Sequence, residues 1–533
     1  MPLQRHVPPC PINRRPGSPG PKLALAALCG LLLACVYIPS NLCAAELLEY
    51  VRTALTHQVD IDRTRLNIDD AQGALLEASG TFDTSIEAKA EHGQTDTPTP
   101  GPQEPQTAYT SQYTLGLKKE LRSGLTLTPQ VQTTRRDDGN TQTQTVSSSG
   151  AYLIATLPLL RGLGAEANAG LERAARQDVQ NARAELKHTM NRVVRDVSKA
   201  YWQYVRDFQQ LQEYRQAEQR AEELFQQTKA LVEADELPAA ELEDVRANLS
   251  EKATTRITNN QAFLQSRQNL GLVLGIPFAQ IRDLPPPQTD FKQIPIAPKR
   301  VHRLHSPALI EQALVNRNDL RAAEGRIDSA QRREKFYENQ LLPRVNLGMK
   351  AGYEGLEEGA PYSTMVDAPF APAPGASWQL SLQYEFPVAN RQARGRLTRQ
   401  QVTRRQQILS HQELARTVQT NVHTTTALLR NAFREIQNAE HTIDLYTRSV
   451  DNQLMKYKMG MGTQIDVITT QDNLSQARLN KINARYKYAQ ALTDLRFQTA
   501  TLLTFTEDQA QVSLSRLTQL PDPSEVQEDT PNP

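Results

Sequence analysis

Two long stretches of the chain carry apolar residues at helical spacing. Neither stretch, about 164–232 or about 391–457, contains proline, and the apolar positions step by three and four. Such positions are Val194, Val197, Tyr201, Tyr204, Phe208 and Leu211, and then Val418, Val422, Thr425, Leu429, Ala432 and Ile436. At a rise of about 1.5 Å per residue, each stretch would form a helix roughly 100 Å long. A compact domain cannot bury such a helix, so we expect it to pack along others in a coiled-coil-like wall.

Other segments alternate apolar and polar residues with the period of a strand. In 377–386, Trp378, Leu380, Leu382, Tyr384 and Phe386 alternate with five polar residues. Further expected strands are 345–353, 82–91 and 151–160, together with 113–121 and 125–131, which form an extra hairpin at about 111–134. Strands of about ten residues with one apolar and one polar face are typical of outer-membrane barrels, although a soluble half-buried sheet has the same pattern.

The chain contains two copies of one unit. Two pairs of matching motifs near the start of each copy share one constant offset, and a pair near the end has a smaller offset. The first copy is therefore the longer one, and the extra hairpin accounts for much of its excess length. The motifs are Ala54-Leu55 with Asp60-Ile61 and Ala313-Leu314 with Asp319-Leu320; Ile68-Asp69 and Ile327-Asp328; and Asn248-Leu249-Ser250 and Asn473-Leu474-Ser475.

Each copy runs helix, strands, very long helix, break and helix. The breaks are Leu237-Pro238 and residues 459–463, and an acidic residue, Glu241 or Asp466, follows each in the next helix. We interpret both as tips of helical hairpins. The expected division is a signal peptide at 1–45, helical parts 46–80 and 164–278 of the first repeat, its strands at 81–163, a proline-rich linker at 279–305, helical parts 306–342 and 390–505 of the second repeat, its strands at 343–389, and a disordered tail at 506–533.

The first 45 residues have the features of a secretory signal peptide. Basic residues precede an apolar run from Leu23 to Ile38, and Cys43-Ala44-Ala45 forms a small-residue cleavage site. All four cysteines lie here, so we expect an exported mature chain without cysteine. An uncleaved anchor is one alternative, because the run is just short of the roughly 20 residues that a spanning helix needs. A lipoprotein signal that leaves an acylated Cys35 is another.

The strands of one chain are too few to close a barrel in a membrane. Closed membrane barrels start at about eight strands, and lipid does not tolerate open sheet edges. We therefore expect an α+β membrane protein in which several copies share one transmembrane β-barrel. Four strands from each of three copies would give about 12, while the extra hairpin would either widen the barrel to about 18 or stand outside the membrane.

Charge and motif content narrow the possible functions. The 60 basic and 59 acidic residues give a net charge of +1. The chain therefore lacks the positive net charge that would indicate nucleic acid as its main partner. The sequence has no Ser/His/Asp signature, P-loop, GxGxxG, CxxC or HExxH motif, so we expect neither an enzyme nor a cofactor. His302 and His305 lie close together in the linker without a nearby cysteine or acidic partner, and we expect no metal site there.

The segment 457–474, YKMGMGTQIDVITTQDNL, resembles the tip motif of the TolC family, with Tyr, Gly, Asp-Val and Leu at these spacings. The strand-to-helix junctions 157–162 and 386–391 and the paired repeats are also similar, over about 46–505. The resemblance implies a homotrimer with a β-barrel in outer-membrane lipid and a long α-helical barrel in the periplasm. It further implies a closable iris at the tip, which docks a periplasmic adaptor protein and an inner-membrane pump.

The same resemblance assigns candidate site residues. Asp466 matches an acidic ring residue of the periplasmic aperture, and Tyr457 matches a tyrosine that helps to hold the tip closed. The chain departs from the family at Thr469, where a second acidic residue is expected, and at Gly462, where arginine is expected. An ordinary carboxylate at a helix N-terminus is the alternative interpretation of Asp466. The tip residues expected to contact the adaptor are Leu237, Pro238, Gly460, Gly462 and Thr463.

These observations predict the outer-membrane exit duct of a tripartite efflux or type I secretion system, a passive conduit from the periplasm to the exterior. The alternative is an exported, elongated coiled-coil scaffold or adaptor protein of the periplasm with a soluble β-domain. The sequence does not identify the cargo, because drugs, metal ions and polypeptides all pass such ducts and the pump selects among them.

Overall fold

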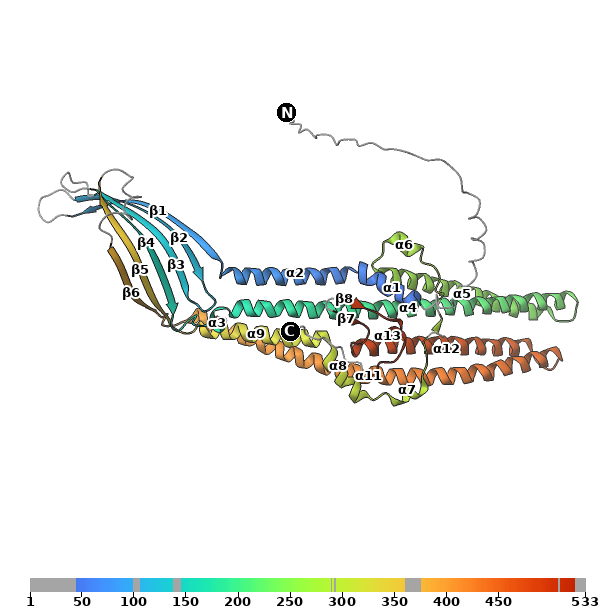
Figure 1. The fold of residues 1–533 in the computed structure, drawn as a ribbon. Coiled ribbons are helices and arrows are strands. Elements are labelled where there is room, and N and C mark those ends of the chain that lie inside the picture. The colour runs from blue at the N-terminus through green and yellow to red at the C-terminus, as the bar shows by residue number, and fades with distance from the viewer. Residues whose placement is uncertain are drawn as a thin grey trace, which may run out of the picture.

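The computed structural model of this chain describes residues 45–98, 106–137, 145–288, 290–291, 294–359, 375–506 and 509–522. Nearly all of the predicted signal peptide, with Cys35, lies outside these ranges, and so do residues 523–533 of the predicted tail. The described part is elongated (Figure 1). A sheet forms one end, long helices run from it to the opposite end, and short helices surround the middle of the bundle.

Six strands form one antiparallel sheet in which each strand pairs with its neighbours in chain order. The strands are β1 Thr84–Thr97, β2 Gln106–Glu120, β3 Thr126–Asp137, β4 Val146–Pro158, β5 Arg344–Glu358 and β6 Gly375–Glu385. The first repeat supplies β1 to β4, the second supplies β5 and β6, and the β4–β5 pair joins the repeats. Every predicted strand is present, and the extra hairpin forms β2 and β3 within the sheet.

Four long helices form two antiparallel hairpins. They are α4 Gly170–Glu233 and α5 Ala239–Leu274 in the first repeat, and α11 Arg391–Lys458 and α12 Gln464–Gln498 in the second. The short helix α3 Ala165–Asn168 precedes α4. With 64 and 68 residues, α4 and α11 have the predicted lengths, and the two tip loops lie together at the end far from the sheet (Figure 1). Among the described residues, no helix combines the length and apolar character that a membrane crossing requires.

The first helical segment of each repeat is two helices, so the prediction of continuous helices at 46–80 and 306–342 was wrong. The first repeat has α1 Ala45–His57 and α2 Val59–Gly80, and the second has α8 Ser306–Asn316 and α9 Asn318–Asn339. The breaks at Gln58 and Arg317 occupy equivalent positions in the two repeats and share an extended backbone. Tertiary contacts stabilise both, since the Gln58 amide donates to the Val273 carbonyl at 3.0 Å and the Arg317 guanidinium donates to the Gln498 side-chain oxygen at 2.6 Å.

The hydrophobic core lies in the middle of the bundle, where the inter-repeat linker crosses α4. The linker contains α6 Phe278–Arg282 and α7 Pro298–Arg303. Its Phe291 stacks on Trp202 with ring centroids 5.7 Å apart, and Tyr204 donates to the Pro285 carbonyl at 2.8 Å. Tyr201, Trp202 and Tyr204 are fully buried. These aromatic residues therefore fix the linker and both repeats around one core.

The predicted disordered tail at 506–533 was wrong for residues 509–522. A small hairpin, β7 Thr504–Thr506 and β8 Gln509–Gln511, leads into α13 Leu514–Thr518. Leu517 and Leu520 are buried in the central core. The buried Arg496 donates to the carbonyls of Gln519 and Leu520, each at 2.9 Å. Two buried leucines and a buried arginine outweigh the polar composition that suggested disorder.

Candidate functional site: a two-faced sheet, a collar and the helical tips

One face of the sheet is apolar across all six strands. A single cross-strand row joins residues of every strand in register: Ala88, Leu115, Val131, Ala151, Tyr353 and Ala376. Because side chains of a strand alternate between faces, the same face carries the next row, Pro129, Leu153, Ala351 and Trp378. Leu115 is 58% exposed and Trp378 is 81% exposed in the single chain. Water-facing surfaces rarely carry an apolar area this continuous.

The opposite face is polar. Its matching row is Glu87, Gly116, Gln130, Tyr152, Gly352 and Ser377. Tyr152 donates to the Glu354 carboxylate at 2.7 Å, and the Lys350 ammonium lies 3.9 Å from the centroid of the Tyr152 ring. An added Cβ at Gly352 would lie 2.1 Å from the Tyr152 ring, so glycine makes room for that ring. One face thus suits hydrocarbon and the other suits water.

A cluster that we call the collar ties the β2–β3 turn to the start of the helices. Its members are Phe82, Arg122, Ser123, Gly124, Gly164 and Glu172. The Arg122 guanidinium donates twice to the Glu172 carboxylate, at 2.7 and 2.9 Å, and lies 5.0 Å from the Phe82 ring centroid. The hydrogen bonds and charge of Arg122 lower the pKa of Glu172, which is 4% exposed. The Gly164 amide donates to the Ser123 carbonyl at 3.0 Å.

The two tip loops share one backbone design. Residues 234–238 connect α4 to α5, and residues 459–463 connect α11 to α12. Asp235 and Gly460 hold equivalent positions in the two repeats, and both have a left-handed backbone, with φ of 56° and 71°. The loops therefore match in conformation as well as position. Of the predicted adaptor-contact residues, Pro238, Gly460 and Thr463 are exposed, while Leu237 and Gly462 are half-buried.

Asp466, the predicted aperture residue, lies exposed in the first turn of α12 and forms a capping box with Thr463. The Thr463 hydroxyl and amide donate to its carboxylate at 2.7 and 3.1 Å, and its own amide donates to the Thr463 hydroxyl at 3.2 Å. These hydrogen bonds lower the pKa of Asp466. The carboxylate thus both caps α12 and places a negative charge at the tip.

Tyr457, the second predicted gate residue, is half-buried near the end of α11. Burial and the charge of Glu241, in the first turn of α5, raise the pKa of Tyr457. The neighbouring Gln464 is buried and donates to the Thr228 hydroxyl of α4. The Gln464–Thr228 hydrogen bond therefore joins the two hairpins of one chain near their tips.

From the tip towards the core, polar contacts link the first repeat to α12, a set that we call the inter-repeat ladder. Lys252 pairs with Asp472 at 2.8 Å, and Arg220 donates to Ser475 at 2.8 Å. Further along, Gln210 donates to Asn483 at 2.9 Å and Lys199 pairs with Asp494 at 2.9 Å. These contacts are polar and half-buried, unlike those of the apolar core, so water can replace them more readily than it can enter the core.

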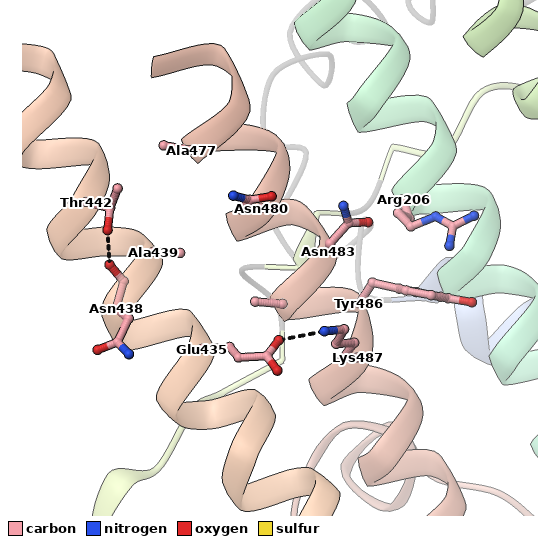
Figure 2. Close-up of a pocket in the computed structure, with 11 residues that line it drawn as sticks. Arg206, Glu435, Asn438, Ala439, Thr442, Ala477, Asn480, Asn483, Tyr486 and Lys487 are labelled. Carbon is pink, nitrogen blue, oxygen red and sulfur yellow. Dashed lines mark hydrogen bonds and ion pairs between the residues drawn. The ribbon is translucent and has the colours of Figure 1, made fainter. Parts of the chain in front are cut away.

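A groove of about 590 Å³ lies beside this ladder, between α11, α12 and α4 (Figure 2). The Lys487 ammonium binds the Glu435 carboxylate at 2.8 Å, and the Arg206 guanidinium lies 4.4 Å from the Tyr486 ring centroid. Asn438, Asn480 and Asn483 line the rest with amide groups. Among the described residues, no group of three or more His, Cys, Asp or Glu side chains is placed to hold a metal ion, and His302 packs edge-on against Phe433.

Residues 309–501 match the family described as outer membrane efflux protein. This match covers the second repeat, from α8 to the end of α12, and the first repeat shares its plan of helices, strands and tip loop. The second repeat is therefore similar to outer membrane efflux proteins. Among curated proteins, none matches the sequence.

Solved outer-membrane channels share the fold of this chain at low identity. The CmeC channel of Campylobacter jejuni is 14% identical with a TM-score of 0.60, over 85% of each chain. VceC of Vibrio cholerae is 12% identical with a TM-score of 0.60, over 86% of this chain and 95% of that one. The open state of the MtrE channel of Neisseria gonorrhoeae is 14% identical with a TM-score of 0.59, over 85% and 88%.

Two features of the site could not be predicted from the sequence. The collar joins Arg122 to Glu172, and the inter-repeat ladder joins residues of different repeats, such as Lys252 and Asp472. No local pattern marks either pair. The sequence signal for the collar was Arg122, a single arginine in the turn between two alternating segments. A charged residue in a turn is also expected when it simply faces solvent, so this signal does not point to Glu172.

Proposed function

We propose that this protein is the outer-membrane channel of a tripartite efflux or type I secretion system, and that it conducts passively from the periplasm to the exterior. The observation that carries the proposal is the apolar row that crosses all six strands, with a polar row on the opposite face. In a transmembrane barrel, the apolar face of the sheet contacts lipid on the outside and the polar face contacts water in the lumen. Partners supply the energy, and the chain itself performs no chemistry.

Three copies share the proposed barrel. Both edge strands, β1 and β6, are exposed along their whole length in the single chain. Open edges are not tolerated in lipid, so β1 of one copy pairs with β6 of the next. The helices then extend into the periplasm from the barrel, and α4, α5, α11 and α12 of the three copies form the wall of the periplasmic duct.

The periplasmic tip serves as the gate. Gln464 holds α12 against α4 of the first repeat, Tyr457 at the end of α11 helps to keep the tip closed, and Asp466 of each copy faces the aperture. Its lowered pKa keeps this carboxylate charged at neutral pH, so three copies present a ring of negative charge. Opening separates α12 from α4 along the inter-repeat ladder, which is polar and can exchange its contacts for water.

An adaptor protein of the periplasm and an inner-membrane pump are the proposed partners. The tip presents exposed apolar side chains, Met459, Met461 and Ile465, in addition to the predicted contact residues Leu237, Pro238, Gly460, Gly462 and Thr463. Exposed methionines suit a surface that adapts to a partner. Drugs, metal ions or polypeptides remain possible cargo, since the pump selects them.

Membrane fractionation with planar-bilayer recording tests the proposed function. The protein should sediment with outer membranes, require detergent for extraction, migrate as a trimer before boiling and form ion-conducting pores. A soluble monomer in the periplasmic fraction would contradict the proposal and favour an elongated periplasmic scaffold instead.

Substitution of Asp466 tests the gate. Asp466→Asn keeps an oxygen that can accept the helix-capping hydrogen bonds but removes the charge, so block by multivalent cations should weaken several-fold. Asp451→Asn is the matched control, because Asp451 is an exposed carboxylate on α11 before the tip. Equal block in wild type and Asp466→Asn would remove Asp466 from the gate without affecting the assignment as a channel.

A further inference from the structure

We propose that the β2–β3 hairpin is part of the membrane wall, so that three copies close a barrel of about 18 strands instead of about 12. This inference rests on the proposed function, and it concerns the size of the barrel and the element that sets it. The alternative that is also compatible with the sequence places the hairpin outside the membrane, with β1 directly beside β4.

The strand pairing supports the first arrangement. Residue pairs join β1 to β2 without a gap from Thr84 with Lys119 to Thr97 with Gln106, and they join β3 to β4 from Thr126 with Thr156 to Arg136 with Val146. The hairpin thus occupies the position between β1 and β4 over nearly the full length of both strands. If the hairpin lay outside the sheet, β1 would instead pair directly with β4.

The hairpin also continues both faces of the sheet. Leu115 and Val131 stand in the apolar row between Ala88 and Ala151, and both are more than half exposed, at 58% and 51%. Gly116 and Gln130 stand in the polar row in the same way. Outside the membrane, the apolar side chains of the hairpin would face water with nothing to cover them. In the barrel wall they face hydrocarbon.

The collar fixes the hairpin at the level where the other strands meet the helices. Besides the Arg122–Glu172 pair, the Asn168 amide of α3 donates to the Glu120 carboxylate at 3.0 Å and to the Leu121 carbonyl at 3.3 Å. The Lys119 ammonium donates to the Phe82 carbonyl at 2.6 Å, just before β1. The turn of the hairpin is therefore held at the periplasmic end of the proposed barrel.

A wider exit lumen follows from this arrangement. Barrel diameter grows roughly linearly with strand number, so about 18 strands give a diameter about 1.5-fold that of about 12 strands. Barrels of about 16 to 18 strands enclose an aqueous channel without further opening. The hairpin therefore sets the size of the outer exit, separately from the gate at the opposite end.

Cysteine cross-linking in the full-length trimer tests the inference. The four natural cysteines all lie in the N-terminal segment that ends at Cys43, and serine in their place leaves a background free of thiols. The pairs Ala88→Cys with Leu115→Cys, and Val131→Cys with Ala151→Cys, should form disulfides within one chain, because these residues are direct cross-strand partners. Ala88→Cys paired in turn with cysteine at Ser149, Ala151 or Leu153 should form none, since three strand spacings amount to roughly 14 Å.

Spin labels at four positions provide a second measurement that does not depend on disulfide formation. Labels at Leu115 and Val131 should be accessible to oxygen and protected from a water-soluble nickel complex, whereas labels at Gln112 and Gln130 on the polar face should show the reverse. Disulfides from Ala88 to β4, or nickel access to Leu115 and Val131, would overturn the inference. If the same samples remain trimeric and conduct ions, the proposed function survives that result; loss of pores and membrane association in the wild type would instead contradict the function.

Discussion

At the residue scale, the collar depends on the close approach of two backbone turns. Gly124 has a φ of +94°, and an added Cβ there would lie 2.3 Å from the Gly162 carbonyl oxygen. Gly164 has a similar φ of +87°, but an added Cβ would meet nothing within 4 Å. The two glycines therefore share backbone strain on substitution and differ only in the contact with the neighbouring turn.

Replacing each of these glycines by alanine distinguishes the cost of backbone strain from the cost of a clash with the neighbouring turn. Gly164→Ala should cost roughly 1–3 kcal/mol, because a φ of 87° with a ψ of 158° is a backbone conformation that essentially only glycine adopts. Gly124→Ala should cost roughly 1–3 kcal/mol more, because the turn must move away from residue 162. Thermal unfolding of the detergent-extracted protein measures both. Equal losses in the two variants would mean that the turns do not pack as described.

A buried charge cluster stabilises the break between α8 and α9. Arg317 and Asp319 are buried, and the guanidinium donates to the carboxylate at 2.9 and 2.6 Å. Arg317→Ala should destabilise the protein by roughly 3–5 kcal/mol, because it leaves a buried carboxylate without its main partner. Arg332→Ala removes a partly exposed pair with Asp328 on the same helix and should cost less than about 1 kcal/mol. Chemical denaturation of both variants provides the comparison, and similar losses would contradict it.

The same cluster makes stability depend on pH. His188 lies 3.6 Å from Asp319, with Arg317, Glu185 and Arg192 nearby. Burial lowers the pKa of His188, so the folded protein binds this proton less tightly than the unfolded chain, in which histidine titrates near about 6.5. The contribution of His188 is therefore present at neutral pH and lost as the pH falls below about 6.5.

Thermal unfolding across this range tests the assignment. The midpoint should fall as the pH decreases from about 7.5 to about 5.5, and the fall should be smaller in His188→Gln. His441→Gln, at an exposed position of α11, should retain the full dependence. An unchanged dependence in His188→Gln would show that other groups cause it.

At the element scale, the long helices and the strands could be predicted from the sequence because their apolar residues are periodic. The strand ends could not, since segments such as 106–112 and 132–137 are polar on both faces and show no alternation. The breaks at Gln58 and Arg317 contain neither glycine nor proline, and contacts with residues distant in the chain, Val273 and Gln498, stabilise them. The tail was misjudged for the same reason, because Leu517 and Leu520 pack on a core formed by residues far along the chain.

The inter-repeat ladder predicts how elements move at the gate. Replacing Lys252 and Arg220 by alanine removes the contacts of the first repeat with Asp472 and Ser475, so the tip should open more often and the time-averaged conductance should rise several-fold. Lys229→Ala is the matched control, because Lys229 pairs with Glu233 of its own helix, at 3.9 Å, and not across the repeats. Unchanged conductance in the double variant would exclude the ladder from closure.

At the scale of the whole molecule, a sheet with one apolar and one polar face stands at one end of helices roughly 100 Å long. Neither open edge of that sheet is stable in lipid in a single chain, and the fold is shared with solved outer-membrane channels. The repeat and the fold class could be predicted from the sequence, and the predicted resemblance agrees with the family match over residues 309–501. The number of strands in the shared wall could not, because alternation alone does not say whether the extra hairpin pairs with its neighbours.

The native mass of the mature protein, extracted from outer membranes in detergent, tests the central claim most directly. A channel that closes its barrel only by pooling strands should have the mass of three chains and should precipitate when the detergent is removed. A monodisperse single chain that stays in solution without detergent would contradict the account.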